Sequence, residues 1–342
     1  MRLRSEIDRR AFSALLRLPR PARRRMAEPI RSLDGRVLDV DIALLESLSR
    51  RRGGSADSVE ALRLAERELF AVAGAVPRRG VATHDRVIRG PGDDLAIRVY
   101  HPPRREGVAP GLVWFHQGGC VIGGLHTCHP WCTLVAERTG AVVVSVDYRL
   151  APEHPFPAAV DDAMASYQWV ADNADGLGLD RRRLAVGGAS AGATLATVVG
   201  QQRRRLGQSQ PALQVLAYPG TDGRAEGGSM VSCADCFPLS RALVELFSRA
   251  YLPDPTAVDD PRFSPAAGDL WGLAPAIVVT AGFDPLRDQG DAYAAALDRA
   301  GVEVVHRRED HLSHSFTSMG RLRACRRASE RLADDIKRSL TG

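Results

Sequence analysis

The sequence predicts an α/β protein with a mainly parallel central sheet, helices flanking that sheet, and an additional helical cap. From about residue 82, short runs rich in β-forming residues alternate with helical segments, as in a parallel sheet wrapped by helices. Runs such as 112–115 and 141–146 are continuously apolar, which suits strands buried on both faces. Before residue 82, the apolar residues follow helical spacing instead.

The elements of this core can be listed in chain order. The run at 96–100 alternates between apolar and polar residues, so we expect an early, partly exposed strand there. The other predicted strands are mostly apolar. The predicted strands are 96–100, 112–115, 141–146, 184–186, 213–218, 276–280 and 302–305, with helices at about 127–139, 158–173, 191–206, 288–300 and 319–339.

The chain length of 342 residues suits one catalytic unit with accessory segments. We expect an N-terminal helical cap segment over residues 1–80 and the main α/β domain over 81–342. The strand–helix rhythm breaks after residue 218, where a loop rich in Gly and Cys precedes a helical stretch at 239–252. We therefore predict an inserted cap segment at about 219–256.

Charge and hydropathy exclude several classes of protein. The net charge is +5, but the arginine runs carry no nucleic-acid-binding motif, so we expect no nucleic-acid partner. Apolar runs are too short to cross a bilayer, so we expect no stable membrane insertion. Arg17 and Arg20 interrupt the apolar stretch near the N-terminus, which favours an amphipathic helix over a signal sequence and predicts a cytoplasmic protein.

Six cysteines are too few for a disulfide scaffold in a chain of this length, so we expect reduced thiols. Two pairs, Cys128 with Cys132 and Cys233 with Cys236, would form a zinc or redox site only if their segments met. Their spacing matches no standard zinc module. We predict no metal and no cofactor.

The strongest local motif is the pentapeptide from Gly188 to Gly192, which reads G-x-S-x-G around Ser190. By itself this pattern is common and can mark an ordinary helix start. Here it follows a predicted strand and precedes a predicted helix, the context of a nucleophile elbow. The two glycines leave room for a sharp turn that exposes the serine oxygen at a helix N-terminus, which also favours developing negative charge.

A second glycine motif, from His116 to Gly119, follows the apolar strand at 112–115. Glycines at a strand end leave backbone N–H groups unshielded, so these groups can bind an oxyanion. The simpler alternative is a plain glycine turn. We expect His116 to support this loop rather than to transfer protons.

A serine nucleophile requires a histidine base, and three histidines follow Ser190 in the chain: His306 at the end of a strand, and His311 and His314 in the loop before the last helix. The acid follows the strand at 276–280. Asp284 lies at that strand's end, whereas we expect Asp288 to cap the next helix.

Together with the stretches 146–158, 251–255 and 283–288, these motifs resemble the hormone-sensitive-lipase family of α/β-hydrolases. That family contains bacterial esterases with an HGGG oxyanion motif and a GDSAGG elbow. The resemblance covers about residues 90–320. It implies an α/β-hydrolase fold in which the segments 1–80 and 219–256 form a cap over the substrate.

The resemblance also implies residue roles. Ser190 matches the nucleophile, Asp284 the acid and, because the family's base precedes a small residue and Phe, His314 the base. Backbone N–H donors are expected from Gly118, Gly119 and Ala191. Three positions depart from the family pattern, because Gln117 replaces a glycine of HGGG, Ala189 an acidic residue and Ala193 the last glycine of the elbow.

The expected function is therefore a serine carboxylesterase that hydrolyses short-to-medium acyl esters through an acyl-enzyme intermediate. Two alternatives remain open at this point: deacetylation or amide hydrolysis of a small metabolite, and a non-catalytic ligand-binding member of the same fold. The expected partner is a small-molecule ester, and a homodimer is compatible with the sequence.

Overall fold

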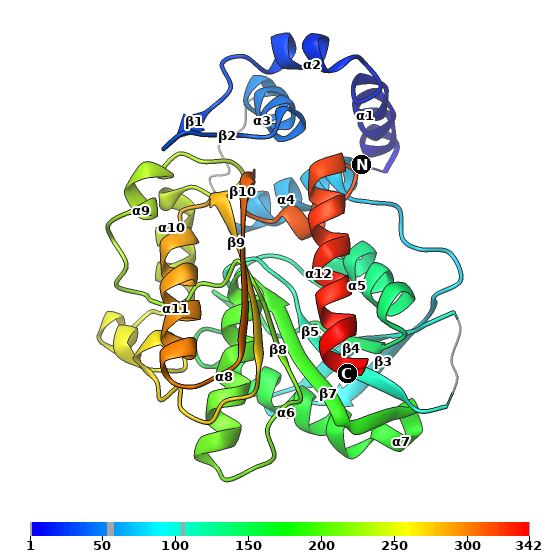
Figure 1. Ribbon diagram of the computed structural model, residues 1–342, viewed down its shortest axis with the longest axis vertical. Helices are drawn as coiled ribbons and strands as arrows, with labels where there is room; N and C mark the ends of the chain where they lie inside the picture. Colours follow the sequence, from blue (N-terminus) through cyan, green and yellow to red (C-terminus); the bar gives the residue numbers. More distant parts are fainter. Residues whose placement is uncertain (1, 53–57, 104–106, 342) are drawn as a thin grey trace.

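An eight-stranded sheet forms the centre of the computed structural model, which describes residues 2–52, 58–103 and 107–341 (Figure 1). The strand order is β10-β9-β8-β7-β5-β6-β4-β3. All neighbours are parallel except at one edge, where β4 is antiparallel to both β3 and β6. The strands are β3 (Ala82–Arg89), β4 (Asp94–His101), β5 (Ala109–Phe115), β6 (Val142–Val146), β7 (Leu179–Ala189), β8 (Gln214–Ala217), β9 (Ala276–Phe283) and β10 (Val304–Ser313).

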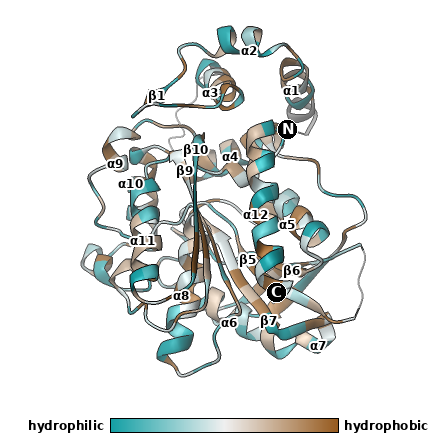
Figure 2. Cartoon of the chain, viewed as in Figure 1, coloured by the Kyte–Doolittle hydropathy of each residue, from teal (hydrophilic) through white to brown (hydrophobic). Residues whose placement is uncertain are grey.

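Helices cover both faces of this sheet (Figure 1). The helices α6 (Ala158–Asp172), α8 (Ala191–Arg205) and α11 (Arg287–Arg299) share one apolar cluster with the sheet, whereas α5 (Leu125–Thr139) and α12 (Arg323–Thr341) share the other. The strands β5, β6, β8 and β9 are buried along their whole length, and Figure 2 shows these central strands as the most hydrophobic part of the chain. The predicted α/β fold class is confirmed.

Several predicted boundaries were wrong. The strand at 82–89 was missed because seven of its eight residues are exposed, so it has no apolar pattern. The strand predicted at 302–305 continues to Ser313, so His306 lies inside β10 rather than at its end. His311 also belongs to β10 and not to the loop after it. Both edge strands are held by backbone pairing with a more apolar neighbour, a tertiary contact that local sequence does not reveal.

The N-terminal segment consists of helices and one short hairpin. The helices are α1 (Arg2–Leu15), α2 (Arg20–Ala27), α3 (Val40–Arg52) and α4 (Val59–Ala73), and the hairpin pairs β1 (Ser32–Leu33) with β2 (Arg36–Val37). Helix α1 packs on α4, and α2 packs on α3. Figure 1 shows α1, α2 and α3 at the top of the molecule, outside the layers around the sheet. The hairpin reaches β10, where the His311 ring donates to the Val37 carbonyl over 2.9 Å.

The segment after β8 contains the short helix α9 (Ser229–Ser232) and the longer helix α10 (Arg241–Tyr251). Remaining short elements are α7 (Ala174–Leu177) and the 3-10 helices η1 (Pro255–Asp259), η2 (Pro265–Ala267) and η3 (Phe316–Ser318). In the described parts of the chain, no helix combines the length and the apolar character needed to cross a bilayer.

Candidate active site

Ser190 lies in the sharp turn between β7 and α8. Its backbone adopts φ 53° and ψ −125°. Non-glycine residues rarely take this conformation, so contacts with the surrounding residues must keep the backbone in it. Part of that support comes from β8, because the Ser190 N–H donates to the Ala217 carbonyl over 2.9 Å. The side chain is 7% exposed and lies beside the N-terminus of α8.

The two glycines of the elbow are required by close backbone contacts. A Cβ atom at Gly188 would overlap the carbonyl of Gly192, and a Cβ atom at Gly192 would overlap the carbonyl oxygens of Phe115 and His116 at the end of β5. These contacts involve backbone atoms, which cannot move aside as the end of a side chain can. The G-x-S-x-G pattern therefore follows from the close approach of the elbow to the neighbouring strand.

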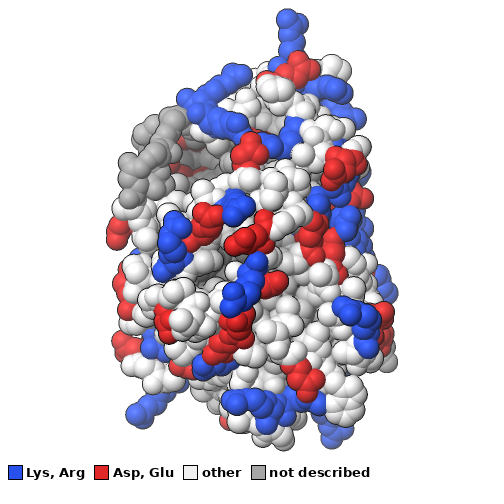
Figure 3. Space-filling model, turned by 90° about the vertical axis from the view of Figure 1, so that its left-hand side faces the viewer, with Lys and Arg blue, Asp and Glu red and all other residues white. Residues whose placement is uncertain are grey.

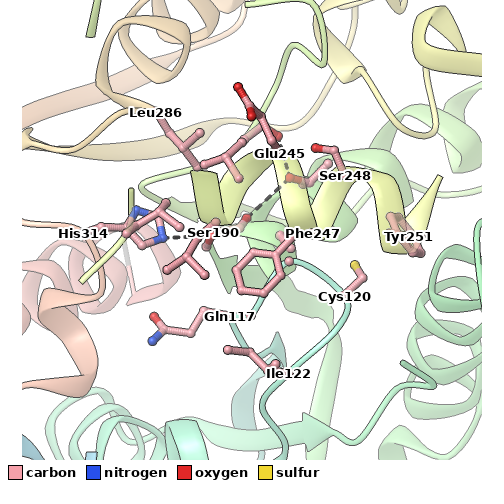
Figure 4. A pocket seen from close by; sticks show the side chains of 18 of the residues that line it. Gln117, Cys120, Ile122, Ser190, Glu245, Phe247, Ser248, Tyr251, Leu286 and His314 are labelled. Atoms are coloured by element: carbon pink, nitrogen blue, oxygen red, sulfur yellow. Dashed lines mark hydrogen bonds between the residues drawn. The ribbon is translucent and has the colours of Figure 1, made fainter. Parts of the chain in front are cut away.

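His314 joins the serine to a carboxylate. In the tautomer protonated at Nδ1, this ring donates to Asp284 Oδ2 over 2.7 Å and accepts the Ser190 hydroxyl at Nε2 over 2.9 Å (Figure 4). His314 directly follows β10, and Asp284 directly follows β9. Asp284 is completely buried, and its second oxygen accepts the Leu286 N–H over 2.8 Å. Such a chain of hydrogen bonds can transfer a serine proton to the histidine.

Asp288 is not the N-cap of α11, contrary to the sequence prediction. Helix α11 begins at Arg287, after Leu286, which places Asp288 inside the first turn. Its carboxylate accepts from the Ser229 N–H over 2.7 Å and from Arg287 Nε over 2.7 Å. Asp288 therefore joins α11 to α9 and lies outside the hydrogen-bonded group around Ser190.

The glycine loop after β5 borders the same cavity as Ser190. Gly118 has φ 129° and Gly119 has φ 63°, both in the region that favours glycine. A Cβ atom at Gly119 would lie 2.5 Å from the ring of Phe247, which packs onto the loop from α10. Ala191 is the first residue of α8, so its N–H has no acceptor within the helix.

His116 is completely buried, and its Nδ1–H donates to the Gln117 carbonyl over 2.8 Å. The ring stacks on Tyr148 with 4.1 Å between ring centroids, and the Tyr148 hydroxyl donates to the His116 carbonyl over 2.7 Å. Burial lowers the pKa of this imidazole, which favours its neutral form. These contacts fit a residue that holds the glycine loop in place.

Gln117, the main departure from the family motif, takes part in a network that sequence reasoning missed. The Tyr218 hydroxyl donates to Gln117 Oε1 over 3.0 Å and also bonds to the Thr317 hydroxyl. The Tyr218 ring contacts His314 edge-on, with 4.7 Å between centroids. The network thus connects the loops that carry Gly118 and His314. The only feature of the sequence that pointed to this network was the position of Tyr218 at the end of an apolar run. Asp284 has a similar position, just after another apolar run.

A cavity of about 500 Å³ extends from Ser190 between the glycine loop and two helices. Helix α4 contributes Leu62, Glu66 and Leu69 to its wall, and α10 contributes Phe247 and Tyr251. Figure 4 shows Ser190 and His314 at the edge of this pocket, with the side chains of α10 across from Gln117 and Ile122. The accessible surface of the wall is mostly apolar, as is usual for a small-molecule site.

Neither cysteine pair contributes a residue to the wall of this cavity. Cys128 and Cys132 are in α5, whereas Cys233 and Cys236 both follow α9. All six cysteines are buried and free. Among the residues that the structure describes, no three His, Cys, Asp or Glu side chains are grouped so that they could hold a metal ion.

Comparison with known proteins identifies the family to which the chain belongs. A family model described as alpha/beta hydrolase fold matches residues 112–318, which include Ser190, Asp284 and His314. The chain belongs to the α/β-hydrolase family. Within it, the match is to the branch that contains the bacterial esterases similar to hormone-sensitive lipase.

Individual relatives of this α/β-hydrolase are named esterases. The carboxylic ester hydrolase LipN of Mycobacterium tuberculosis is 41% identical over 89% of this chain and 84% of its own length. An ethyl acetate hydrolase of Pseudomonas putida is 39% identical over 67% of this chain and 73% of its own length. A hyperthermophilic esterase from the archaeon Pyrobaculum calidifontis has a solved structure that matches with a TM-score of 0.82 and 36% identity, over 88% of this chain and 98% of its own. The chain is therefore an esterase.

Proposed function

We propose that this esterase is a serine carboxylesterase whose catalytic triad is Ser190, His314 and Asp284. In this mechanism His314 Nε2 takes the Ser190 proton while Oγ attacks the ester carbonyl, and the histidine then gives that proton to the leaving alcohol. Asp284 keeps the ring in the required tautomer and stabilises the imidazolium. Water, activated by the same histidine, then hydrolyses the acyl-enzyme. The continuous hydrogen-bonded chain from Ser190 through His314 to Asp284 is the observation that carries this proposal.

The backbone N–H groups of Gly118, Gly119 and Ala191 form the oxyanion hole in this proposal. The two positive φ angles and the helix N-terminus beside Ser190 support it, since both leave N–H groups available near the nucleophile. Each such donor contributes about 10²–10³ in rate. No metal or cofactor takes part in any step.

We further propose that the segments 1–80 and 219–256 act together as the cap of the substrate pocket. The support is that α4, from the first segment, and α10, from the second, line the cavity of about 500 Å³ above Ser190. A cavity of this size, closed by two helices, favours short-to-medium acyl esters over long triglyceride chains.

The test is hydrolysis of p-nitrophenyl esters of increasing acyl length by the wild type and three variants. Ser190→Ala and His314→Ala should each lose about 10⁴-fold or more in kcat. His311→Ala is the matched control, because this histidine is exposed and its ring bonds to the Val37 carbonyl of the β1–β2 hairpin, so the variant should stay active. A serine-directed fluorophosphonate should label the wild type but not Ser190→Ala. Full activity of Ser190→Ala would overturn the triad, and a rate that peaks at long acyl chains would overturn the substrate class.

A further inference from the structure

Helix α1 has two apolar sides, of which only one packs against the core. On the inner side, Phe12 is 3% exposed and belongs to the apolar cluster of α5 and α12, with Leu15 partly buried against that cluster. On the outer side, Ile7 is 59% exposed, and Ala11 and Ala14 are exposed too. Residues 7, 11 and 14 share one face of the helix, because their spacing of four and three residues follows its turn. A surface helix needs an apolar side only where it meets the core, so packing within this chain does not explain the outer side.

The outer apolar side continues beyond the end of α1. The Arg17 N–H donates to the Ala14 carbonyl over 3.1 Å, and the Leu18 N–H donates to the Leu15 carbonyl over 3.0 Å, so the chain makes one more turn. Leu18 is 39% exposed and, four residues after Ala14, lies on the same side as Ile7. Ile7 and Leu18 therefore form the two ends of an exposed apolar stripe.

Exposed arginines accompany this stripe on α1, on the turn after it and on α2. They are Arg10, Arg17, Arg20, Arg24 and Arg25. Glu28 is the one exposed acidic residue between positions 7 and 28, and its carboxylate lies 3.9 Å from the Arg24 guanidinium. Figure 3 shows Lys and Arg gathered at the top of the molecule, where the N-terminal helices lie. We call the surface formed by these five arginines with Ile7, Ala11, Ala14 and Leu18 the N-terminal face.

The N-terminal face fits an anionic partner that also accepts apolar side chains. Its excess of arginines disfavours a second copy of the same face, because symmetric pairing would bring like charges together. A nucleic acid would pair with the arginines, but its phosphates and sugars offer no apolar contact to the stripe between them. A bilayer surface that contains anionic lipids provides both contacts. Its headgroups carry the negative charge, and the acyl chains beneath them accept side chains such as Ile7 and Leu18.

We propose that the N-terminal face binds peripherally to the surface of a bilayer that contains anionic lipids. In this arrangement α1 lies along the interface, Ile7 and Leu18 point between the headgroups, and the arginines bind lipid phosphates. Helix α1 packs on α4, and α4 lines the cavity beside Ser190. Binding through this face therefore places the substrate pocket one helix away from a lipid surface, where apolar esters accumulate.

The experiment measures binding of the 342-residue chain to sucrose-loaded vesicles by sedimentation. Vesicles of phosphatidylcholine alone are compared with vesicles that also contain phosphatidylglycerol, an anionic lipid. The wild type should sediment with the anionic vesicles and stay in solution with the neutral ones. Raising NaCl from about 0.1 M to about 1 M should release most of it, because the Debye length falls from about 10 Å to about 3 Å. Equal binding to both kinds of vesicle, or binding to neither, would overturn the inference.

Two double variants test whether the N-terminal face is responsible for this binding. Arg17→Gln combined with Arg20→Gln should lower the partition coefficient about 25-fold, at about fivefold for each arginine. Arg181→Gln combined with Arg182→Gln is the matched control, because it removes the same charge from exposed positions of β7, at the opposite end of the molecule from α1 (Figure 1). The control should bind as the wild type does. Equal losses in both double variants would overturn the inference, since binding would then follow net charge alone.

Ile7→Ser tests the apolar part of the face. We expect vesicle binding to weaken severalfold, because a large apolar side chain no longer enters the interface. Ile7 is exposed, so thermal unfolding should match that of the wild type. Vesicle binding equal to that of the wild type would contradict the proposed role of the stripe. Binding of the wild type to single-stranded RNA but not to anionic vesicles would identify a nucleic-acid surface instead and would also overturn the inference.

Discussion

At the scale of single residues, the site depends on groups that support the hydrogen-bonded chain of Ser190, His314 and Asp284 without belonging to it. Tyr218 shows this most clearly. It follows β8, its own backbone has φ 40°, its hydroxyl joins Gln117 to Thr317, and its ring contacts His314. Gln117 therefore does more than replace a glycine, because its amide oxygen connects the glycine loop, through Tyr218, to the loop that carries His314.

Tyr218→Phe removes the hydroxyl while keeping the ring against His314. We expect the free energy of unfolding to fall by about 1–3 kcal/mol, because the buried oxygen of Gln117 loses its donor. We also expect kcat to fall about ten- to a hundredfold, because both loops shift relative to Ser190. Chemical denaturation and ester hydrolysis measure the two effects.

Tyr293→Phe is the control for Tyr218→Phe. It removes a buried hydroxyl bonded to Thr197 and Gln201, so it should lose stability but keep kcat. Equal losses of kcat in both variants would contradict this role.

Gly192 is required for a different reason, which is that the structure has no room for a side chain at this position. Gly192→Ala should destabilise the protein by about 3 kcal/mol or more, because the new Cβ would overlap two backbone oxygens at the end of β5. Gly140→Ala is the control. That glycine ends α5 at φ 73° with nothing within 4 Å of the position of a Cβ, so it should cost only about 1 kcal/mol of backbone strain. Thermal unfolding compares the two, and equal losses would argue against steric exclusion at the elbow.

At the scale of elements, α4 is tied to the rest of the protein by polar contacts from two of its residues. Arg63 pairs with both oxygens of Glu153, over 2.6 and 2.8 Å, and donates to the carbonyls of Val121 and Ala151. Its guanidinium lowers the pKa of Glu153 to about 2. Glu66 accepts hydrogen bonds from Thr127 and His126 of α5. Because Val121 follows the glycine loop, Arg63 links α4 to that loop directly.

Arg63→Ala should loosen α4 over the pocket. We expect KM for short acyl esters to rise severalfold and the free energy of unfolding to fall by about 1–2 kcal/mol, mostly through the lost backbone contacts, since the ion pair with the half-exposed Glu153 contributes less. Steady-state kinetics and denaturation provide the measurements. Arg67→Ala, an exposed position of the same helix, should change neither. A KM equal to that of the wild type would show that Arg63 does not hold α4 in its working position.

At the scale of the whole molecule, positive charge is concentrated in the N-terminal segment, whereas the cysteine thiols are all in the interior. Residues 1–36 contain eleven arginines and four acidic residues, more excess positive charge than the whole chain carries. Figure 3 shows one face, on which Lys and Arg gather toward the top, where the N-terminal helices lie, and both signs are mixed below. The cysteines, in contrast, are all in the interior.

Because all six thiols are buried, the native protein should react slowly with a thiol reagent such as dithionitrobenzoate, and six thiols should react after unfolding. For four of them, Cys120, Cys132, Cys236 and Cys325, burial contributes to a raised pKa, which disfavours the reactive thiolate. Thiol titration with and without denaturant is the measurement. Rapid reaction of one or more thiols in the folded protein would contradict this arrangement.

The sequence by itself determined the fold class, the elbow and the residues that lie together in the site. These features depend on short-range patterns: continuous apolar runs for buried strands, and glycines two residues from Ser190 where backbone must approach backbone. Asp284 was found because it follows a predicted strand, whereas His314 was chosen through the family resemblance, in which the base precedes a small residue and Phe. Parallel pairing of β9 with β10 brings the two residues to one edge of the sheet. That position was enough to separate Asp284 from Asp288 before any contact was known.

Only the tertiary structure decided the remaining features. The strand β3 forms because β4 supplies its hydrogen bonds, and the extension of β10 past His306 forms beside β9, so neither has an apolar pattern of its own. The contact between Gln117 and Tyr218 joins residues that are 101 positions apart in the sequence. Such properties depend on which elements pack together, and residues distant in sequence carry no local signal of that packing.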